Sequence, residues 1–307
     1  MYELTVEVKE KAREGLEKYL GADTDRFIAN AEVLINKYIK QWQLYQLHYM
    51  VTNTVNMLFT CDSAIHGQCV LKVCLPGPEV ATEINCISAY EGKGYVKLWG
   101  YNLSDSILLL ERVAPGTQMW AVKDYKQRAQ LVAKTIKNLP FVQCNQGKYP
   151  TYKTWMKGIH KKLRCMGGLD DALFYLDKAL GIYDEIKEKY NRNVLLHGDM
   201  HQENLLLNHQ GNYTIIDPKG VVDDPIMETA RFLMNEIPCK PEKIYAMVSL
   251  MAPIIGVEEA DMLKSMYIDA ALGQCWTFEE HFPTREAFNK SKHEVLETCN
   301  FVHSLLK

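Results

Sequence analysis

The stretch HGDMHQENLLLNHQGNYTIIDPKG, residues 197–220, indicates both the fold class and the chemistry of this sequence. Within it, ENLLLN (203–208) and YTIID (213–217) flank a His-Gln-Gly-Asn turn, which predicts a β-hairpin. Asp199, Asn204 and Asp217 lie around the ends of these strands. Phosphoryl transfer from ATP needs a carboxylate that orients and deprotonates the attacking hydroxyl, and oxygen ligands for Mg²⁺. We therefore predict that Asp199 is the catalytic base and that Asn204 and Asp217 are the metal ligands.

The same stretch allows two other interpretations. Asp and Asn side chains often cap turns, which would make these residues purely structural. His197 and His201 flank Asp199 in an H-x-D-x-H spacing that a zinc or di-metal hydrolase could use. A hydrolase predicts further ligands at metal-site spacing, but the remaining histidines are scattered and Asn204 and Asp217 would have no role. We favour His197 and His201 as residues that brace the loop by hydrogen bonds.

Lys72, far upstream, supports the phosphotransfer interpretation. It lies in the middle of a predicted strand, on one of its two faces. In the helix that follows, Glu83 lies on the stripe of Val80 and Ile87, where an apolar side chain is expected. We expect Lys72 and Glu83 to pair and to hold the ammonium group against the phosphates of ATP. The alternative is a salt bridge that serves the structure alone.

The spacing of apolar residues divides the chain into two regions. Two amphipathic helices come first, along stripes that begin at Val8 and Phe27, with Asp23 or Thr24 as the cap of the second. Alternating apolar positions then predict strands near 45–51, 55–61, 69–75, 95–99 and 106–113, with a helix near 79–90. Beyond Pro115 the pattern is mainly helical. We predict an α+β fold of two lobes. The first, residues 1–113, contains the two opening helices and a five-stranded antiparallel sheet with one helix. The second, residues 114–307, is mainly helical.

Length and composition exclude several classes of protein. The chain has 307 residues, an apolar fraction of 47% and a net charge of -3, so it can bury a large core and is not a disordered tail. It has no long basic run, which argues against nucleic acid or an anionic membrane surface as the main partner. The charge-free run 244–257 contains Pro253 and is too short for a bilayer, which takes about 20 residues. We predict a buried helix there.

The ends of the chain and its cysteines indicate a compartment. The first twenty residues alternate charges and lack the apolar stretch of a secretion signal, so we expect a cytoplasmic protein. The nine cysteines are an odd number without a C-x-x-C pair. We interpret them as reduced core residues.

These motifs together resemble the aminoglycoside phosphotransferase family, which are small-molecule kinases with a protein-kinase-like fold. HGDMHQEN is similar to the catalytic loop of that family. IDPKGVVDDPIMETARFLMN, LLLERVAPGTQM and ALGQCWTFEE are similar to the branch that contains streptomycin 6-phosphotransferases and hydroxyurea phosphotransferases. The resemblance implies a two-lobe fold, MgATP as the donor, and a hydroxyl of an antibiotic or antibiotic-like compound as the acceptor.

The resemblance also implies roles for individual positions. It assigns the catalytic base to Asp199, the magnesium ligands to Asn204 and Asp217, the phosphate-binding lysine to Lys72, its partner to Glu83, and adenine binding to backbone groups of 110–113, with Glu111 and Val113 as our candidates.

Two departures from related patterns limit these assignments. The turn expected to cover the phosphates, Thr52-Asn53-Thr54-Val55-Asn56, contains no glycine. Thr52 and Asn53 could still bind phosphate through hydroxyl, amide and backbone N–H groups, but an inert nucleotide-binding module becomes the non-enzyme alternative. In addition, no activation-loop signature follows IDPKG, which argues against a protein as the acceptor.

Charge indicates the nature of the acceptor. Residues 220–307 contain 8 Lys and Arg against 14 Asp and Glu, a net of -6, so the rest of the chain carries -3 minus -6, or +3. An acidic C-terminal region would attract a cationic amino or guanidino sugar, and streptomycin is the first compound to test. Another alcohol metabolite is the alternative, since one fold serves many acceptors. The candidate acceptor residues are Asp223, Asp224, Glu228, Glu279 and Glu280.

Overall fold

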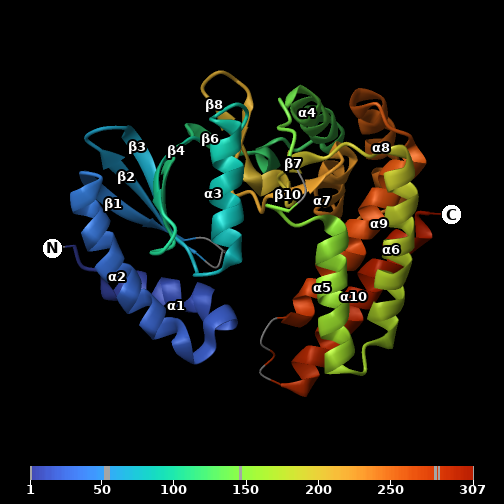
Figure 1. Cartoon of the computed structure of the whole chain (residues 1–307), viewed down its shortest axis with the longest axis horizontal. Coiled ribbons are helices and arrows are strands. Elements are labelled where there is room, and N and C mark those ends of the chain that lie inside the picture. Colours follow the sequence, from blue (N-terminus) through green and yellow to red (C-terminus); the bar gives the residue numbers. More distant parts are fainter. Residues whose placement is uncertain (1, 52–55, 145–146, 280–281, 283, 307) are drawn as a thin grey trace. The chain divides into compact units, whose positions relative to one another are not determined.

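The computed structural model describes residues 2–51, 56–144, 147–279, 282 and 284–306. The chain divides into two compact units, Met1–Gly116 and Thr117–Lys307. The first contains the sheet-rich part of the ribbon in Figure 1, and the second contains most of the helices. This is the α+β architecture that the sequence predicts.

The N-terminal unit is built on a five-stranded antiparallel sheet. The strands are β1 (Leu44–Met50), β2 (Met57–Ser63), β3 (Gly67–Val73), β4 (Leu98–Asn102) and β5 (Ile107–Glu111), in the spatial order β1-β2-β3-β5-β4. The predicted five-stranded sheet is therefore confirmed. The predicted strand at 95–99 starts too early, because Tyr95 belongs to the core below the sheet: its ring stacks on Tyr90 with centroids 4.0 Å apart.

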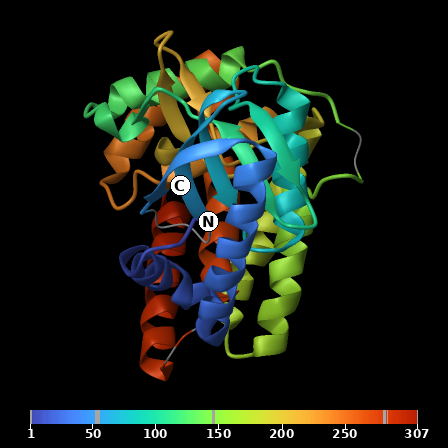
Figure 2. The ribbon, with the colours of Figure 1, turned by 90° about the vertical axis from the view of Figure 1, so that its left-hand side faces the viewer.

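Three helices complete this unit. α1 (Val6–Leu20) and α2 (Thr24–Gln41), joined by the 3-10 turn η1 (Gly21–Asp23), precede the sheet, and α3 (Pro78–Tyr90) follows β3. Figures 1 and 2 show α1 and α2 on one side of the sheet and α3 on the other. The sheet is thus covered on both faces.

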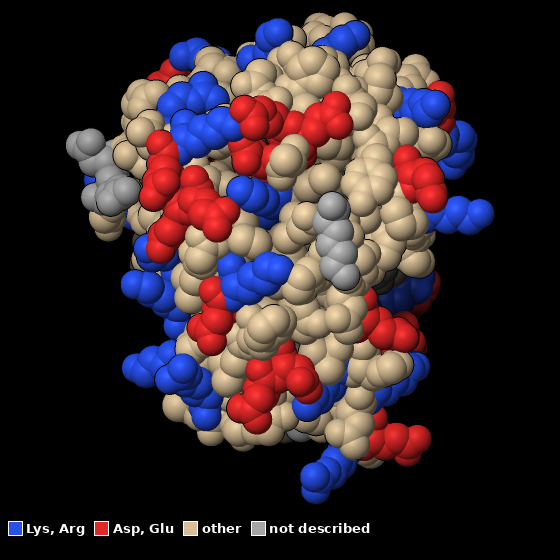
Figure 3. Space-filling model, turned by 90° about the vertical axis from the view of Figure 1, so that its right-hand side faces the viewer, with Lys and Arg blue, Asp and Glu red and all other residues tan. Residues whose placement is uncertain are grey.

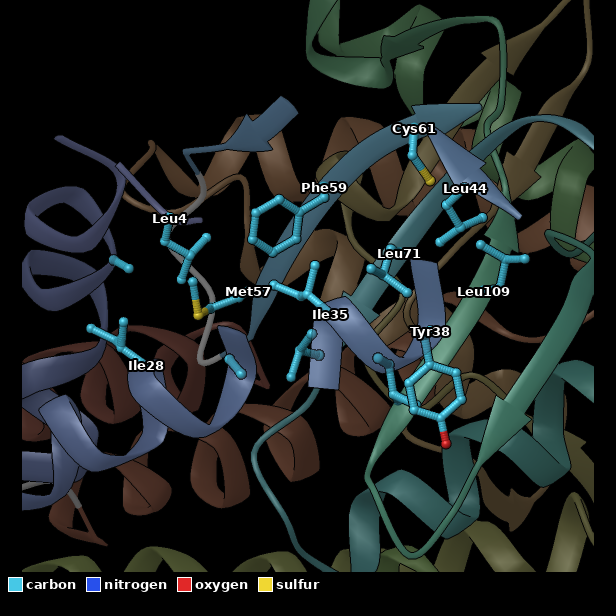
Figure 4. Close-up of a cluster of buried hydrophobic side chains, with 14 of the residues drawn as sticks. Leu4, Ile28, Ile35, Tyr38, Leu44, Met57, Phe59, Cys61, Leu71 and Leu109 are labelled. Atoms are coloured by element: carbon cyan, nitrogen blue, oxygen red, sulfur yellow. The ribbon is translucent and has the colours of Figure 1, made fainter. Parts of the chain in front are cut away.

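The main core of the unit lies between the opening helices and the sheet. Ile28, Ile35 and Tyr38 of α2 pack with Phe59 and Leu71 of the strands, as the labelled side chains in Figure 4 show. Of the stripe predicted along α2, Ala31 and Tyr38 are buried as expected. Phe27 and Leu34 are only partly buried against the same cluster, and their neighbours Ile28 and Ile35 are buried instead. Both sets of residues recur with a helical period, so the sequence alone does not separate them.

The C-terminal unit begins within β6 (Pro115–Gln118), which crosses the division between the units. Its long helices are α4 (Tyr125–Asn138), α5 (Tyr152–Met166), α6 (Asp170–Lys189), α8 (Pro241–Ile255), α9 (Glu259–Trp276) and α10 (Arg285–Ser304), with the shorter α7 (Glu228–Met234). Its other strands and 3-10 turns are η2 (Met119–Ala121), β7 (Val194–Leu196), η3 (Gln202–Asn204), β8 (Leu205–Asn208), β9 (Tyr213–Ile215), β10 (Val221–Asp223), η4 (Pro225–Met227) and η5 (Thr277–Glu279). α9 packs against α6, α7 and α10, which places it at the centre of the unit.

Two short antiparallel pairs carry the loops of the predicted site. β8 and β9 form the predicted hairpin, with Leu205 opposite Ile215. β7 pairs with β10, with Leu196 opposite Val221, which the sequence analysis does not foresee because each strand has only three residues. The segments before and after the hairpin are therefore held side by side.

The predicted buried helix is α8. Pro253 lies inside it, and the helix ends at Ile255 with Gly256 in the left-handed conformation. Among the described residues, no helix combines the length and the apolar character needed to span a membrane.

All nine cysteines are thiols rather than halves of disulfides. Six are buried, which agrees with the prediction, but Cys144 and Cys239 are half-buried and Cys165 is exposed. The prediction of core positions is wrong for these three, because local apolar context does not reveal which side of an element faces the core.

Candidate active site

Lys72 and Glu83 form the predicted pair in the N-terminal unit. Successive residues of β3 point to opposite faces of the sheet, and Leu71 and Val73 point to the core with α2, so Lys72 lies on the face toward α3. There its Nζ donates to Oε1 of Glu83 across 2.7 Å. The two side chains are only 4% and 9% exposed. A buried cation and carboxylate at this distance stabilise each other's charged forms.

The stretch after β5 offers a backbone donor for the predicted adenine contact. The N–H of Glu111 donates to Lys97 O (2.9 Å), and the N–H of Arg112 donates to Gln68 O (3.2 Å). Within the described part of the chain, the N–H of Val113 donates to no other group. Val113 is therefore the first position of this stretch whose N–H is available to a ligand.

Part of the predicted phosphate turn falls outside the described residues, which exclude 52–55 and therefore Thr52 and Asn53. Asn56, the last residue of that turn, accepts a hydrogen bond from the N–H of Leu75 through Oδ1 (3.1 Å). Glu280 also lies outside the described residues.

The predicted catalytic loop runs from β7 through η3 to β8 in the C-terminal unit. Gly198, before Asp199, has φ 78, in the left-handed region that favours glycine. A Cβ at this position would lie 2.7 Å from Cγ1 of Val221 and 2.9 Å from the ring of Trp155. Only glycine allows this close approach. The side chain of Asp199 remains 28% exposed, so a substrate hydroxyl can reach it.

His197 ties the loop to the strand that precedes Asp217. Its Nδ1 accepts from the N–H of Asp199 (3.0 Å), and its Nε2 lies 2.7 Å from Ile216 O. Because Nδ1 accepts, the neutral ring carries its proton on Nε2 and donates to that carbonyl. Burial lowers the pKa of His197 to about 4, so the ring is neutral at physiological pH. The predicted bracing role of His197 is confirmed.

Further hydrogen bonds join the segments that carry Asp199, Asn204 and Asp217. Nδ2 of Asn204 donates to Asp199 O, and the N–H of Ile216 donates to Asn204 O, each across 3.0 Å. With Nδ2 engaged in this way, the amide oxygen of Asn204 is the atom that suits a cation. One amide oxygen and the carboxylate of half-buried Asp217 are ligands of the hard kind that Mg²⁺ prefers.

The histidines on which the zinc-hydrolase interpretation depends make hydrogen bonds within the protein. Nowhere in the described ranges do three or more His, Cys, Asp or Glu side chains gather in a way that could hold a metal ion. Both ring nitrogens of His197 are engaged with the backbone. His201 caps η3, where its Nδ1 accepts from the N–H of Glu203 (3.3 Å).

Two charged residues near Asp199 were not foreseen. Nε of Arg231, on α7, lies 3.2 Å from Oδ1 of Asp199 and 3.3 Å from Oδ2 of Asp269, on α9. Asp269 is 1% exposed, and burial raises its pKa to about 6 although Arg231 acts in the opposite direction. The available signal was a charge inside an apolar run: Arg231 stands in TARFLM and Asp269 in MYIDAAL.

Glu228 is a candidate acceptor residue, and the structure places its carboxyl group against the backbone of the catalytic loop. It is buried, and Oε1 accepts the N–H of His197, with the N–H of Gly198 also bonded to this carboxyl group. Burial raises the pKa of Glu228 to about 8, against the effect of these two donors. Its contacts are those of a residue that supports the loop, so we leave it out of the acceptor site.

Asp223 and Asp224 are also buried and bonded within the protein. Asp223 accepts from the hydroxyl of Tyr183 (2.8 Å) and from Nζ of Lys187 (3.1 Å). Asp224 caps η4 and accepts from the N–H of Arg192 (3.0 Å). Neither carboxylate is presented to a substrate, and we leave both out of the acceptor site. Glu279 differs, since it is exposed and pairs with Lys162 across 2.6 Å.

Comparison with solved structures shows the fold. The choline kinase LicA from Streptococcus pneumoniae aligns with a TM-score of 0.66 at 11% identity, over 88% of this chain and 99% of that one. A thermostable mutant of aminoglycoside phosphotransferase APH(4)-Ia, solved with ADP and hygromycin B, aligns with a TM-score of 0.61 at 13% identity, over 88% and 97% of the two chains. The chain therefore has the protein-kinase-like fold of small-molecule kinases.

Comparison of sequences then shows the family. Residues 48–280 match the aminoglycoside/hydroxyurea antibiotic resistance kinases, and the chain belongs to that family. Hydroxyurea phosphotransferase of Kitasatospora aureofaciens is 23% identical over 223 residues, which are 71% of this chain and 65% of that protein. Streptomycin 6-kinase of Streptomyces glaucescens is 21% identical over 223 residues, 72% of each chain. This chain thus covers somewhat under two thirds of the first relative.

Proposed function

We propose that the protein transfers the γ-phosphoryl group of ATP to a hydroxyl of a small molecule, with an aminoglycoside such as streptomycin, or a related antibiotic, as the acceptor. One observation carries the proposal: hydrogen bonds from His197 and Asn204 bring the segments of Asp199, Asn204 and Asp217 together in one unit. These are the residue types that phosphotransfer requires, and membership of the kinase family supports the same reaction.

Asp199 acts as the base in this scheme. It accepts the proton of the acceptor hydroxyl while the hydroxyl oxygen bonds to the γ-phosphorus, and the bond from that phosphorus to the bridging oxygen of ADP breaks. Asn204 and Asp217 would hold Mg²⁺, which neutralises charge on the phosphates when bound. The catalytic effect comes mainly from positioning and electrostatic stabilisation.

The N-terminal unit supplies nucleotide binding. Lys72, oriented by Glu83, presents its ammonium group to the phosphates, in a buried position where a charge interacts more strongly than in water. The available N–H of Val113 and the carbonyl of Glu111 serve the adenine. Thr52 and Asn53 remain candidates for the phosphate turn.

The proposal of a cationic acceptor rests on charge and on the relatives. Residues 220–307 carry a net charge of -6, and two relatives are named streptomycin 6-kinase. Figure 3 shows a face on which acidic and basic side chains are mixed, with acidic side chains gathered in several groups. Charge on that face is therefore not uniform, and selection depends on individual residues such as Glu279 and Glu280.

A transfer assay with labelled nucleotide tests the function. Purified protein is incubated with Mg²⁺ and with γ-labelled ATP or GTP as the donor. The acceptors tested are streptomycin, other amino-sugar antibiotics, hydroxyurea and common hydroxyl metabolites. Each product is identified by mass. Label on an aminoglycoside supports the proposal in full. Label on a different alcohol supports the kinase but overturns the proposed acceptor class.

Thermal shift with MgATP separates the remaining alternative. An inert nucleotide-binding module would be stabilised by MgATP and transfer label to none of the acceptors. That combination of results contradicts the proposed function.

A further inference from the structure

Arg231 stands between the proposed base and a buried carboxylate. Its Nε is nearly equidistant from Oδ1 of Asp199 (3.2 Å) and Oδ2 of Asp269 (3.3 Å). Asp269 lies in the middle of α9, at the centre of the unit, and is almost completely buried. Both contacts are ion pairs rather than hydrogen bonds, because Nε of Arg231 and both carboxylate oxygens of Asp269 have no hydrogen-bond partner in the described part of the chain. Arg231 therefore has a buried carboxylate on one side and the proposed base on the other.

The helix behind Arg231 has a gap that fits the guanidinium group. At Gly273 of α9, a Cβ would lie 2.7 Å from Nη2 and 2.9 Å from Nη1 of Arg231. Real Cβ atoms do not approach other atoms this closely, so any other residue would displace the guanidinium group. Glycine in a helix interior lowers helix stability relative to alanine. At this position it leaves room for the guanidinium group at the cost of helix propensity.

We infer that Arg231 is a positioning residue for Asp199, anchored by Asp269 and accommodated by Gly273. The inference rests on the proposed phosphotransferase function. Arg231 holds one carboxylate oxygen of Asp199, Oδ1, and so orients the other toward the acceptor hydroxyl. Loss of this contact lets the carboxylate rotate away from its productive orientation, and a misplacement of about 1 Å in a catalytic group can cost about 10²-fold in rate.

A purely structural role for Arg231 is the alternative. In that case the guanidinium group only neutralises Asp269, and its contact with Asp199 has no effect on turnover. The two roles differ in what they predict for Gly273, because a substitution there moves the guanidinium group without removing any charge.

Substitution of Arg231 is the first arm of the test. We expect Arg231→Ala to lower kcat by about 10²-fold with little change in KM for ATP or for the acceptor, because orientation of the base affects the chemical step. Arg231→Lys should recover part of the loss, since a lysine keeps the charge but not the planar geometry. A decrease in kcat with a comparable increase in KM for both ATP and the acceptor, together with a lowered unfolding temperature, would indicate a folding defect. That result would contradict the inference.

Gly273→Ala is the second arm, and Gly181→Ala is its control. Gly181 lies in helix α6, where an added Cβ meets nothing within 4 Å. Both substitutions should stabilise their helices. Only Gly273→Ala should lower kcat, and in the Arg231→Ala background it should have no further effect, because the group that it displaces is gone. An equal loss in both backgrounds would show that Gly273 acts independently of Arg231 and would overturn the inference.

A spectroscopic arm does not depend on turnover. The Nε–H resonance of Arg231, assigned by its disappearance in Arg231→Lys, should shift in both Asp199→Asn and Asp269→Asn but not in Gly181→Ala. An unshifted resonance in Asp199→Asn would overturn the contact itself. If the resonance shifts but no acceptor is labelled by the unmodified protein, the geometry stands and the proposed function fails.

Discussion

The charged candidate site residues of the two units are paired differently. In the N-terminal unit, one lysine faces one carboxylate, Lys72 and Glu83, across 2.7 Å. In the C-terminal unit, one guanidinium, Arg231, faces two carboxylates, those of Asp199 and Asp269. The first contact joins one positive and one negative side chain, whereas the second joins one positive side chain to two negative ones.

This difference matches the tasks proposed for the two units. A positive side chain held in place by a carboxylate suits the binding of phosphates, which bring their own negative charge. An excess of carboxylates suits a site that binds a divalent cation and accepts a proton. Burial of charge is costly in both units, so each arrangement depends on its partners remaining in position.

The largest effect is expected at the base. Asp199→Asn should lower kcat by about 10²–10⁴-fold, because the amide cannot accept the proton of the hydroxyl. The change is nearly isosteric, so the unfolding temperature should stay close to that of the unmodified protein. Asp184→Asn, at an exposed carboxylate of α6 that pairs with Lys153, is the control and should retain full activity. Undiminished turnover in Asp199→Asn would remove this residue from its role.

The Lys72–Glu83 pair of the N-terminal unit gives the next effect. Lys72→Met should destabilise the protein by about 3–5 kcal/mol, because it leaves the charge of buried Glu83 without the ammonium group. It should also impair the use of ATP. Lys72→Met with Glu83→Gln should regain most of the stability and none of the activity, as measured by urea unfolding and by label transfer. Recovery of activity in the double variant would mean that the pair is structural only.

Acid should weaken the brace of the C-terminal unit. The pKa of His197 is about 4 in the folded protein, whereas its ordinary value is 6.5. Below about pH 6.5, the unfolded chain therefore takes up a proton that the folded protein does not. Stability present above that pH is lost as the pH falls toward 4, by at most about 1.4 kcal/mol per pH unit. His197→Asn should show a shallower decline in urea unfolding from about pH 7 to about pH 5. His209→Asn, in the exposed hairpin turn, is the control, and identical slopes in all three proteins would contradict the prediction.

The smallest effect is expected at the surface. Glu279→Gln should change the free energy of unfolding by no more than about 1 kcal/mol, because its pair with Lys162 is exposed. If Glu279 contacts a cationic acceptor, KM for streptomycin should rise by up to about fivefold while KM for ATP stays constant. Glu185→Gln, at an exposed pair with Lys264, is the matched control. A constant KM for streptomycin would exclude Glu279 from the acceptor site.

Local periodicity explains which features could be predicted from the sequence. The alternation of β3 and the stripe of α3 each fix one side of an element, so the sequence alone predicts the pairing of Lys72 with Glu83. The hairpin around 209–212 is likewise local. For the same reason the burial of Asp223 was missed: it depends on the hydroxyl of Tyr183, forty residues away along the chain.

The cluster of Arg231, Asp269 and Gly273 could not be predicted for a related reason. Its members lie on two helices, and no periodic pattern specifies which turn of α7 meets which turn of α9. Each residue alone has an ordinary interpretation. Their meaning comes only from their juxtaposition with Asp199.

The backbone at Asp217 restricts which substitutions this position tolerates. Its φ of 57 lies in a region that Asp, Asn and Gly enter more readily than other residues. Asn and Gly satisfy the backbone but carry no negative charge, and Glu carries the charge but fits the backbone poorly. In a saturation library, every replacement at this codon should therefore score below aspartate, with glutamate failing through misfolding of the loop and asparagine through loss of cation affinity.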